Sequence, residues 1–253
     1  MRHASPKQQQ NQPAKSKLVM TTVAITPADA PRLTVDLAEL LGQVAQYYSK
    51  KILTYGPTPL GVDWSCVPTQ EMRFVQLLKV CEFDGTFDGA IRLNDIGCGY
   101  GALLGFLGKR YRKKKIDYLG LDISPTMIAQ AKKRWGNRAL TSFGVASSGF
   151  RAADYTVASG IFNVKLAQPV TLWEQMIAQT IDEMHASSQR GFAMNFLAPL
   201  PDGTPHIPEL YSAPSEVWCS YCQQTLGAQV EVVTGYGLRE YTLLVRKASS
   251  SAY

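Results

Sequence analysis

The chain has 253 residues, and 45% of them are hydrophobic, which is enough to fill the core of one sizeable α/β domain. No run of 18 apolar residues occurs, so we expect a soluble protein without a membrane-spanning helix. The formal net charge is +6, but residues 1–33 carry +4 of it, with five basic residues and one acid. The excess therefore marks a basic leader and is poor evidence for a nucleic-acid partner.

Residues 1–33 are rich in Gln, Lys, Ala and Pro and hold too little apolar material to fold alone, so we predict a disordered leader. An apolar stretch at 18–25, followed by Ala28-Asp29-Ala30, imitates a secretory signal with its cleavage site. That stretch is only eight residues long, contains two threonines and is followed by Pro31, which argues against secretion. The five cysteines are an odd number without a disulfide framework, which fits a reducing, cytoplasmic compartment.

Residues 34–88 predict a helical cap ahead of the first strand. Apolar side chains recur at helical spacing over 35–53, and a second helix is expected over 69–81. The loop between them, 56–64, is rich in Gly and Pro yet carries Leu60 and Trp64. These pieces can fold over a ligand site in residues 89–253, which complete a single domain at 34–253.

From residue 89 onward, strands and helices alternate. The strands are expected near 91–95, 117–121, 140–145, 154–160, 191–197, 229–234 and 239–246, and the helices near 102–112, 125–135, 171–187 and 214–226. Ser124 as N-cap, Pro125 at the first helical position and Gly136 past the end delimit one of these helices. The alternation predicts a doubly wound, mostly parallel sheet, in which residues 234–237 can form a hairpin but no crossover.

The most informative motif, Asp95-Ile96-Gly97-Cys98-Gly99-Tyr100-Gly101, lies between a predicted strand and a predicted helix. Alternate glycines permit a turn against which a ligand can lie, and the helix N-terminus behind it offers free N–H groups. The next strand ends in Asp122, where an acid can accept both ribose hydroxyls of a nucleoside. The same glycines also satisfy a dinucleotide-binding pattern. Asp95, however, would repel a pyrophosphate and attract the ammonium of S-adenosylmethionine, so the motif favours that cofactor over a nicotinamide dinucleotide.

Three segments, Asp95–Gly101, Leu121–Pro125 and Tyr155–Asn163, resemble the first, second and fourth-strand motifs of the class I S-adenosylmethionine-dependent methyltransferases. The resemblance covers roughly residues 35–247, and region 48–73 looks like the bacterial small-molecule type, similar to the trans-aconitate methyltransferases. It implies a Rossmann-like, seven-stranded sheet with an antiparallel last strand. It also implies S-adenosyl-L-methionine as cofactor, no metal, and methyl transfer to a small-molecule acceptor.

The resemblance also assigns site residues. Asp95 and the three glycines would hold the methionine part and the ribose, and Asp122 would take the ribose hydroxyls. Gln70 and Arg73 are candidates for the methionine carboxylate, although Arg73 can equally form a surface ion pair with Glu71. The expected cofactor contacts, of which Met127 is as readily a core residue, are Asp95, Gly97, Cys98, Gly99, Gly101, Asp122, Ile123, Met127, Ser159, Gly160, Gln70 and Arg73.

No catalytic residue stands out, because methyl transfer needs alignment and exclusion of water, and a base only where the nucleophile must lose a proton. By position, the candidates are His206, Asn163 and Tyr48, and a loop histidine such as His206 can also be a bystander. The segment Asn163-Val164-Lys165-Leu166 lacks the prolines of base-amino methyltransferases, which argues against methylation of DNA bases.

Two further patterns are interpreted structurally. The basic run at 109–115 ends a helix at the edge of the sheet opposite the cofactor, where it suits the helix dipole. Cys219 and Cys222 share one helix face and are expected to pack rather than bind metal. The alternative functions are methylation of RNA or protein, and a cofactor-binding module without turnover. The sequence does not indicate an oligomeric state.

Overall fold

The computed structural model describes residues 30–81 and 89–247. Most of the predicted leader therefore lies outside the described residues, as do 82–88 and 248–253. The helical elements are α1 Ala30–Tyr55, η1 Pro59–Val62, α2 Val67–Leu77, η2 Leu78–Cys81, α3 Ala102–Arg110, α4 Pro125–Trp135, α5 Val170–Ser187 and α6 Ser215–Gln224. The strands are β1 Ile91–Ile96, β2 Ile116–Asp122, β3 Thr141–Val145, β4 Ala153–Ala158, β5 Ser188–Leu197, β6 Gln229–Val233 and β7 Glu240–Arg246.

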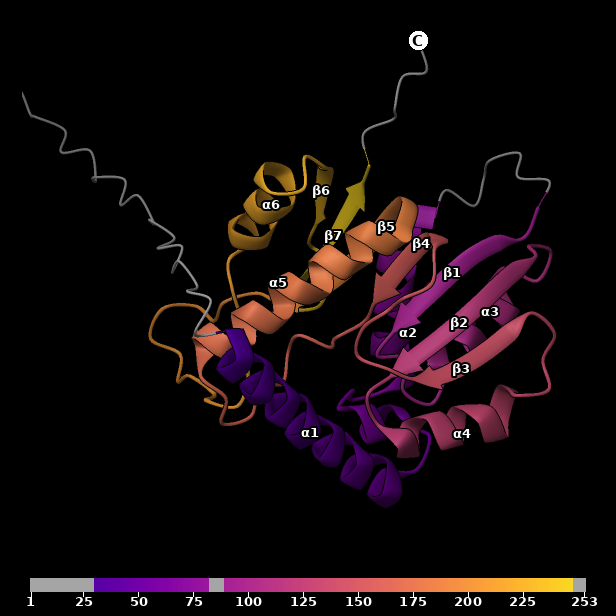
Figure 1. The fold of residues 1–253 in the computed structure, drawn as a ribbon, viewed down its shortest axis with the longest axis horizontal. Helices are drawn as coiled ribbons and strands as arrows, with labels where there is room; N and C mark the ends of the chain where they lie inside the picture. The colour runs from indigo at the N-terminus through magenta and orange to yellow at the C-terminus, as the bar shows by residue number, and fades with distance from the viewer. Residues whose placement is uncertain (1–29, 82–88, 248–253) are drawn as a thin grey trace, which may run out of the picture.

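The strands form one seven-stranded sheet in the order β3-β2-β1-β4-β5-β7-β6 (Figure 1). Strands β1 to β5 run parallel, and β7 is antiparallel to both β5 and β6. The β6–β7 connection contains Gly235 and Gly237, both with positive φ, which a tight hairpin favours. The predicted doubly wound sheet with an antiparallel last strand is confirmed, and it brings Glu240 at the start of β7 beside Leu197 at the end of β5.

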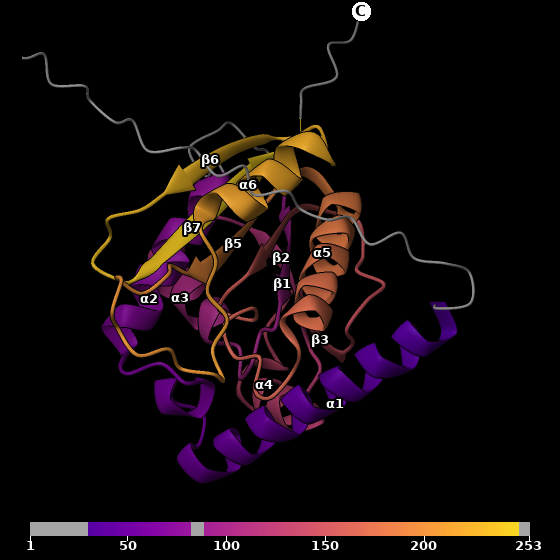
Figure 2. The same cartoon turned by 90° about the vertical axis from the view of Figure 1, so that its left-hand side faces the viewer.

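Helices cover both faces of the sheet, as Figure 2 shows. On one face, α2, α3 and α4 pack against side chains such as Leu93, Tyr118 and Val157. On the other, α5 and α6 pack against Phe192 and Leu243. Strand side chains alternate between the two faces, so all seven strands contribute to a two-sided core that fixes the positions of the strand ends.

Helix α1 runs across the lower end of the molecule in Figure 1, beyond the carboxyl ends of the parallel strands. It contacts α4, α5 and η1, and its Ser49 hydroxyl lies 2.7 Å from that of Ser124. The helix begins at Ala30, so its first four residues belong to the predicted leader. Helix α2 and η2 contact β5 and β7, so they belong to a layer on the sheet, while α1 and the η1 loop form the cap. In the part of the chain that the structure describes, no helix has the length and apolarity to cross a membrane.

Candidate functional site

The turn after β1 contains glycines in the left-handed region of φ, and at Gly97 a side chain would also clash. The N–H groups of Gly97 and Cys98 both donate to the carbonyl of Leu121, at 2.7 and 3.0 Å, which ties the turn to the end of β2. Gly97 and Gly99 have φ of +70° and +53°. A Cβ on Gly97 would lie 2.1 Å from Cγ2 of Ile161, so this backbone requires glycine.

Asp122 ends β2 and is held by two backbone donors. Its Oδ2 accepts the N–H of Gly99 and its Oδ1 accepts the N–H of Ser124, both at 2.8 Å. The side chain is buried, and burial raises its pKa to about 6, against the lowering effect of the two N–H bonds. Each oxygen keeps a lone pair, so the carboxylate can still accept hydrogen bonds from a ligand.

Asp95, near the end of β1, is only 2% exposed. The hydroxyl of Tyr118 donates to its Oδ2 at 2.5 Å. Burial raises the pKa of Asp95 to about 7, the Tyr118 hydrogen bond lowers it, and the nearby charge of Asp122 raises it further. Two buried acids side by side form an electronegative site that a cationic ligand would stabilise.

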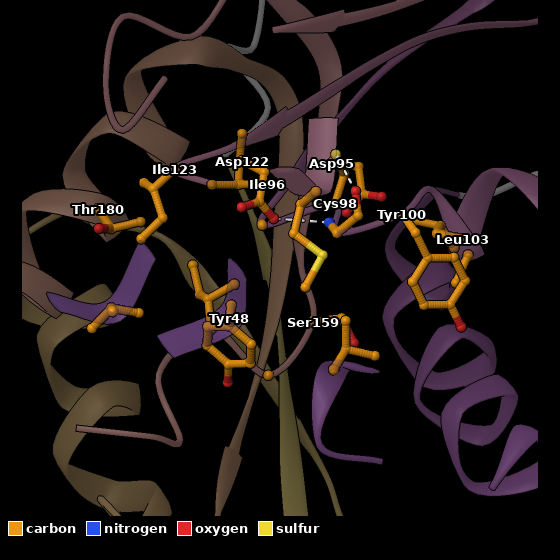
Figure 3. Close-up of a pocket in the computed structure, with 18 of the residues that line it drawn as sticks. Tyr48, Asp95, Ile96, Cys98, Tyr100, Leu103, Asp122, Ile123, Ser159 and Thr180 are labelled. Carbon is orange, nitrogen blue, oxygen red and sulfur yellow. Dashed lines mark hydrogen bonds between the residues drawn. The ribbon is translucent and has the colours of Figure 1, made fainter. Parts of the chain in front are cut away.

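These groups line a cavity of about 1040 Å³, which includes the part open to solvent. In Figure 3, Asp95 and Asp122 lie on either side of Cys98, while Tyr48 and Thr180 approach from other elements. The glycine turn and the ends of β1, β2 and β4 line the cavity. Residues of α1, the η1 loop, α2, α3 and α5 line it as well.

Comparison with known proteins is consistent with this geometry. The family model of a methyltransferase domain matches residues 94–191, which contain the glycine turn and Asp122. A Mycobacterium tuberculosis protein named as a methyltransferase, Rv1506c, is 43% identical over 157 residues, which are 62% of this chain and 93% of that protein. The chain belongs to the class I S-adenosylmethionine-dependent methyltransferases.

Solved methyltransferases share the fold. The magnesium protoporphyrin IX methyltransferase of Synechocystis PCC 6803 with bound S-adenosylmethionine superimposes with a TM-score of 0.52 at 14% identity, over 71% of this chain and 80% of that one. Human N-acetylserotonin methyltransferase, also in complex with S-adenosylmethionine, gives 0.53 at 12% identity, over 87% and 60%. As a member of this family, the chain has S-adenosylmethionine as its cofactor.

The residues of the cavity fit that cofactor chemically. Asp122 offers fixed acceptors for the two ribose hydroxyls, and Asp95 offers a carboxylate for the ammonium. The Tyr100 hydroxyl donates to Oε1 of Gln70 at 3.0 Å, so the Gln70 amide nitrogen remains as a donor for a carboxylate. Ile123 and Met127 supply an apolar wall beyond Asp122 for a purine ring.

Most residues that the sequence predicts for the site of this methyltransferase line the same cavity. They are Gln70, Asp95, Gly97, Cys98, Gly99, Asp122, Ile123, Met127, Ser159 and Gly160, together with Tyr48. Gly101 does not line it. A Cβ on Gly101 would lie 2.7 Å from Cδ1 of Trp135, so this glycine lets α3 pack closely against α4. The expectation that Gly101 contacts the cofactor is therefore wrong.

The expectation that Arg73 binds the methionine carboxylate is also wrong, as is the alternative of a surface pair with Glu71. Arg73 is buried, and its Nη2 and Nε bond to the carboxylate of Glu240, at 2.5 Å for Nη2–Oε1. Its Nη1 donates to the carbonyl of Thr69 at 2.7 Å. The guanidinium lies 3.6 Å above the ring of Trp64, and Glu71 instead contacts Lys109.

Two of the three candidate catalytic residues lie away from the cavity lining. His206 is exposed in the connection after β5. Asn163 is buried outside the lining, and its side chain has no hydrogen-bond partner among the described residues. Tyr48 does line the cavity, but burial raises the pKa of its hydroxyl far above the usual value. Burial therefore favours the protonated form of the Tyr48 hydroxyl at neutral pH, in which it can donate a hydrogen bond.

The sequence motifs did not identify several residues that lie far from them in the sequence but near the site in the fold. Glu240 is the first residue of β7 and is buried, and a buried carboxylate requires a partner elsewhere in the fold. Leu41 and Val44 on α1, and Trp173, Met176 and Thr180 on α5, also line the cavity. Cys219 and Cys222 lie on α6 as free thiols, and the described residues contain no group of three or more potential metal ligands.

Proposed function

We propose that this methyltransferase transfers the methyl group of S-adenosylmethionine to a small molecule held between the glycine turn and α1. The observation that supports this proposal is the continuity of the cavity. Residues of α1 and α5 line the same cavity as the glycine turn and Asp122. A small acceptor can enter such a space whole, whereas a polymer needs an open surface beside the methyl group.

The side chains have a simple task in this reaction. S-adenosylmethionine supplies a methyl group already activated by its sulfonium, so the protein contributes alignment and a dry environment. Asp122 and Asp95 orient the nucleoside and amino acid parts, and Trp64 and Tyr48 help to close the cavity over the reacting atoms. This division of labour is consistent with the lack of an obvious base among the residues that line the cavity.

Methylation of RNA or protein is the rival function. Its strongest support would be the basic run at 109–115, but Lys115 precedes β2, at the amino-terminal end of the parallel strands. The glycine turn and Asp122 lie at the opposite, carboxyl end of these strands, so a polymer bound to the lysines would not reach the methyl group. The resemblance to trans-aconitate methyltransferases supports the proposal of a small-molecule acceptor. It does not identify that acceptor.

The experiment is transfer of a labelled methyl group. The protein is incubated with methyl-labelled S-adenosylmethionine and with the low-mass, RNA and protein fractions of a bacterial extract, separately. We expect label in the low-mass fraction, and none with Asp122→Ala. Label in RNA or protein would favour the rival function. Binding of the cofactor without transfer to any fraction would indicate a cofactor-binding module.

A further inference from the structure

We infer that the methyl acceptor is an uncharged, largely apolar small molecule. The inference rests on the proposed small-molecule function and adds the chemical class of the substrate. It comes from the residues of α1 and α5 that line the cavity and that have no assigned contact with the cofactor.

Two helices, α1 and α5, supply these lining residues. Helix α5 presents Trp173, Met176 and Thr180, which are three and four residues apart and therefore share one helix face. Helix α1 presents a second set at the same spacing, Leu41, Val44 and Tyr48. Carbon and sulfur atoms make up most of these side chains, so the walls suit an apolar ligand.

The charges of the residues that line the cavity also favour an uncharged ligand. Among the described residues that line it there is no Lys, Arg or His, and the charged side chains are Asp95 and Asp122. Of the cations close to the lining residues, Arg73 is paired with Glu240 and Lys51 with Asp63, while Arg134 lies over the ring of Tyr100, 5.8 Å from its centroid.

A carboxylate or phosphate entering this space would lose its hydration, and no Lys, Arg or His among the described lining residues would serve as its counter-ion. A polycarboxylate acceptor is therefore disfavoured, even though the sequence resembles trans-aconitate methyltransferases.

Hydroxyl groups without a partner among the described residues remain for orientation, and one of them is the buried Oγ of Ser159, which also lines the cavity. No hydrogen bond joins the Tyr48 hydroxyl to another described residue, whereas the Thr180 hydroxyl already donates to the Met176 carbonyl at 2.9 Å. Burial keeps the Tyr48 hydroxyl protonated, so it can donate one hydrogen bond to a ligand or accept one from it. An apolar molecule with one or two polar atoms would suit both the apolar walls and these hydroxyl groups.

The test uses two probes that differ by one charge, N-phenyl-1-naphthylamine and 8-anilinonaphthalene-1-sulfonate. Each is titrated by fluorescence into protein saturated with S-adenosylhomocysteine, whose own binding is measured by calorimetry. We expect the neutral probe to bind with a Kd at least about tenfold lower than that of the sulfonate. Thr180→Arg should strengthen sulfonate binding by roughly fivefold, because it places a cation in the cavity wall.

Thr171→Arg is the matched control, since Thr171 is exposed on the same helix and does not line the cavity, and it should leave both affinities unchanged. The inference is overturned if the sulfonate binds as tightly as the neutral probe, if neither probe binds, or if Thr180→Arg has no effect. Loss of S-adenosylhomocysteine binding would instead overturn the cofactor site, so the two failures are distinguishable.

Discussion

Arg73 of α2 and Glu240, the first residue of β7, form a buried ion pair at 2.5 Å that joins the helix before the sheet to its antiparallel strand. Hydrogen bonds of Asn195 connect this ion pair to the site. The Nδ2 of Asn195 donates to Glu240 at 2.7 Å, and the Oδ1 of Asn195 accepts the N–H of Gly160 at 2.8 Å. On the other side, Arg73 stacks on Trp64, which lines the cavity beside Gly160. The ion pair therefore positions two walls of the cavity without touching the cofactor site itself.

Glu240→Gln should destabilise the protein by roughly 3–5 kcal/mol, because the buried guanidinium of Arg73 would lose its counter-ion. Chemical denaturation measures the free energy of unfolding. The matched control is Glu71→Gln, which removes the exposed pair with Lys109 and should cost less than about 1 kcal/mol. The double variant Arg73→Leu with Glu240→Leu should recover part of the lost stability, since no unpaired charge remains buried. Equal losses for Glu240→Gln and Glu71→Gln would contradict the positioning role.

Gly160→Ala should reduce cofactor affinity through Trp64. Gly160 has φ of +74°, and a Cβ there would lie 2.3 Å from Cζ2 of Trp64, so the indole must move. Gly149 has φ of +73° but open space around its Cα, so Gly149→Ala adds the backbone strain alone. Both variants should lose about 1–2 kcal/mol of stability. Only Gly160→Ala should also weaken S-adenosylhomocysteine binding, by roughly tenfold, which equals 1.4 kcal/mol. Equal affinities of the two variants in calorimetry would show that Trp64 does not shape the site.

The sequence predicts the fold well where signals are local. Ser124 caps α4 through its hydroxyl, and α4 spans Pro125–Trp135, the predicted range. The glycines at 235 and 237 mark the hairpin that makes β7 antiparallel. Period, caps and turn residues act over a few positions, so a single chain displays them directly.

Prediction fails where a role depends on a partner far along the chain. Arg73 is 167 residues from Glu240, and no local pattern distinguishes a buried, paired arginine from one that faces a ligand. Gly99 and Gly101 look alike in the motif, yet one lines the cavity and the other meets Trp135 of α4. These differences arise from tertiary packing, which spacing within a motif does not encode.

Asp122→Ala should lower cofactor affinity by roughly 100-fold or more, because two hydrogen bonds to a charged group are lost. The change also leaves the N–H groups of Gly99 and Ser124 without their acceptor, which loosens the glycine turn. Calorimetric titration with S-adenosylmethionine measures the effect. Asp117→Ala, at the other end of β2, removes a half-exposed pair with Arg151 and serves as the control, with unchanged affinity expected. Retention of wild-type affinity in Asp122→Ala would remove this carboxylate from the site.

Cofactor binding should depend on pH through Asp95. Its pKa in the folded protein is about 7, above the ordinary value of 3.8, so the ligand-free protein is more stable when this group is protonated. That contribution is fully present below about pH 4 and is lost as the pH rises through 7.

A cationic ligand favours the ionised form, so affinity for S-adenosylmethionine should fall by up to about tenfold per pH unit below 7, and more steeply below 6, where Asp122 is protonated as well. Calorimetric titrations between pH 5.5 and 8 test this. Tyr118→Phe removes the hydrogen bond that lowers the pKa of Asp95, so the fall should begin at higher pH. Tyr221→Phe, whose hydroxyl donates to the distant Asp182, should keep the wild-type profile. An affinity that is constant across this range would mean that Asp95 does not face the charge of the cofactor.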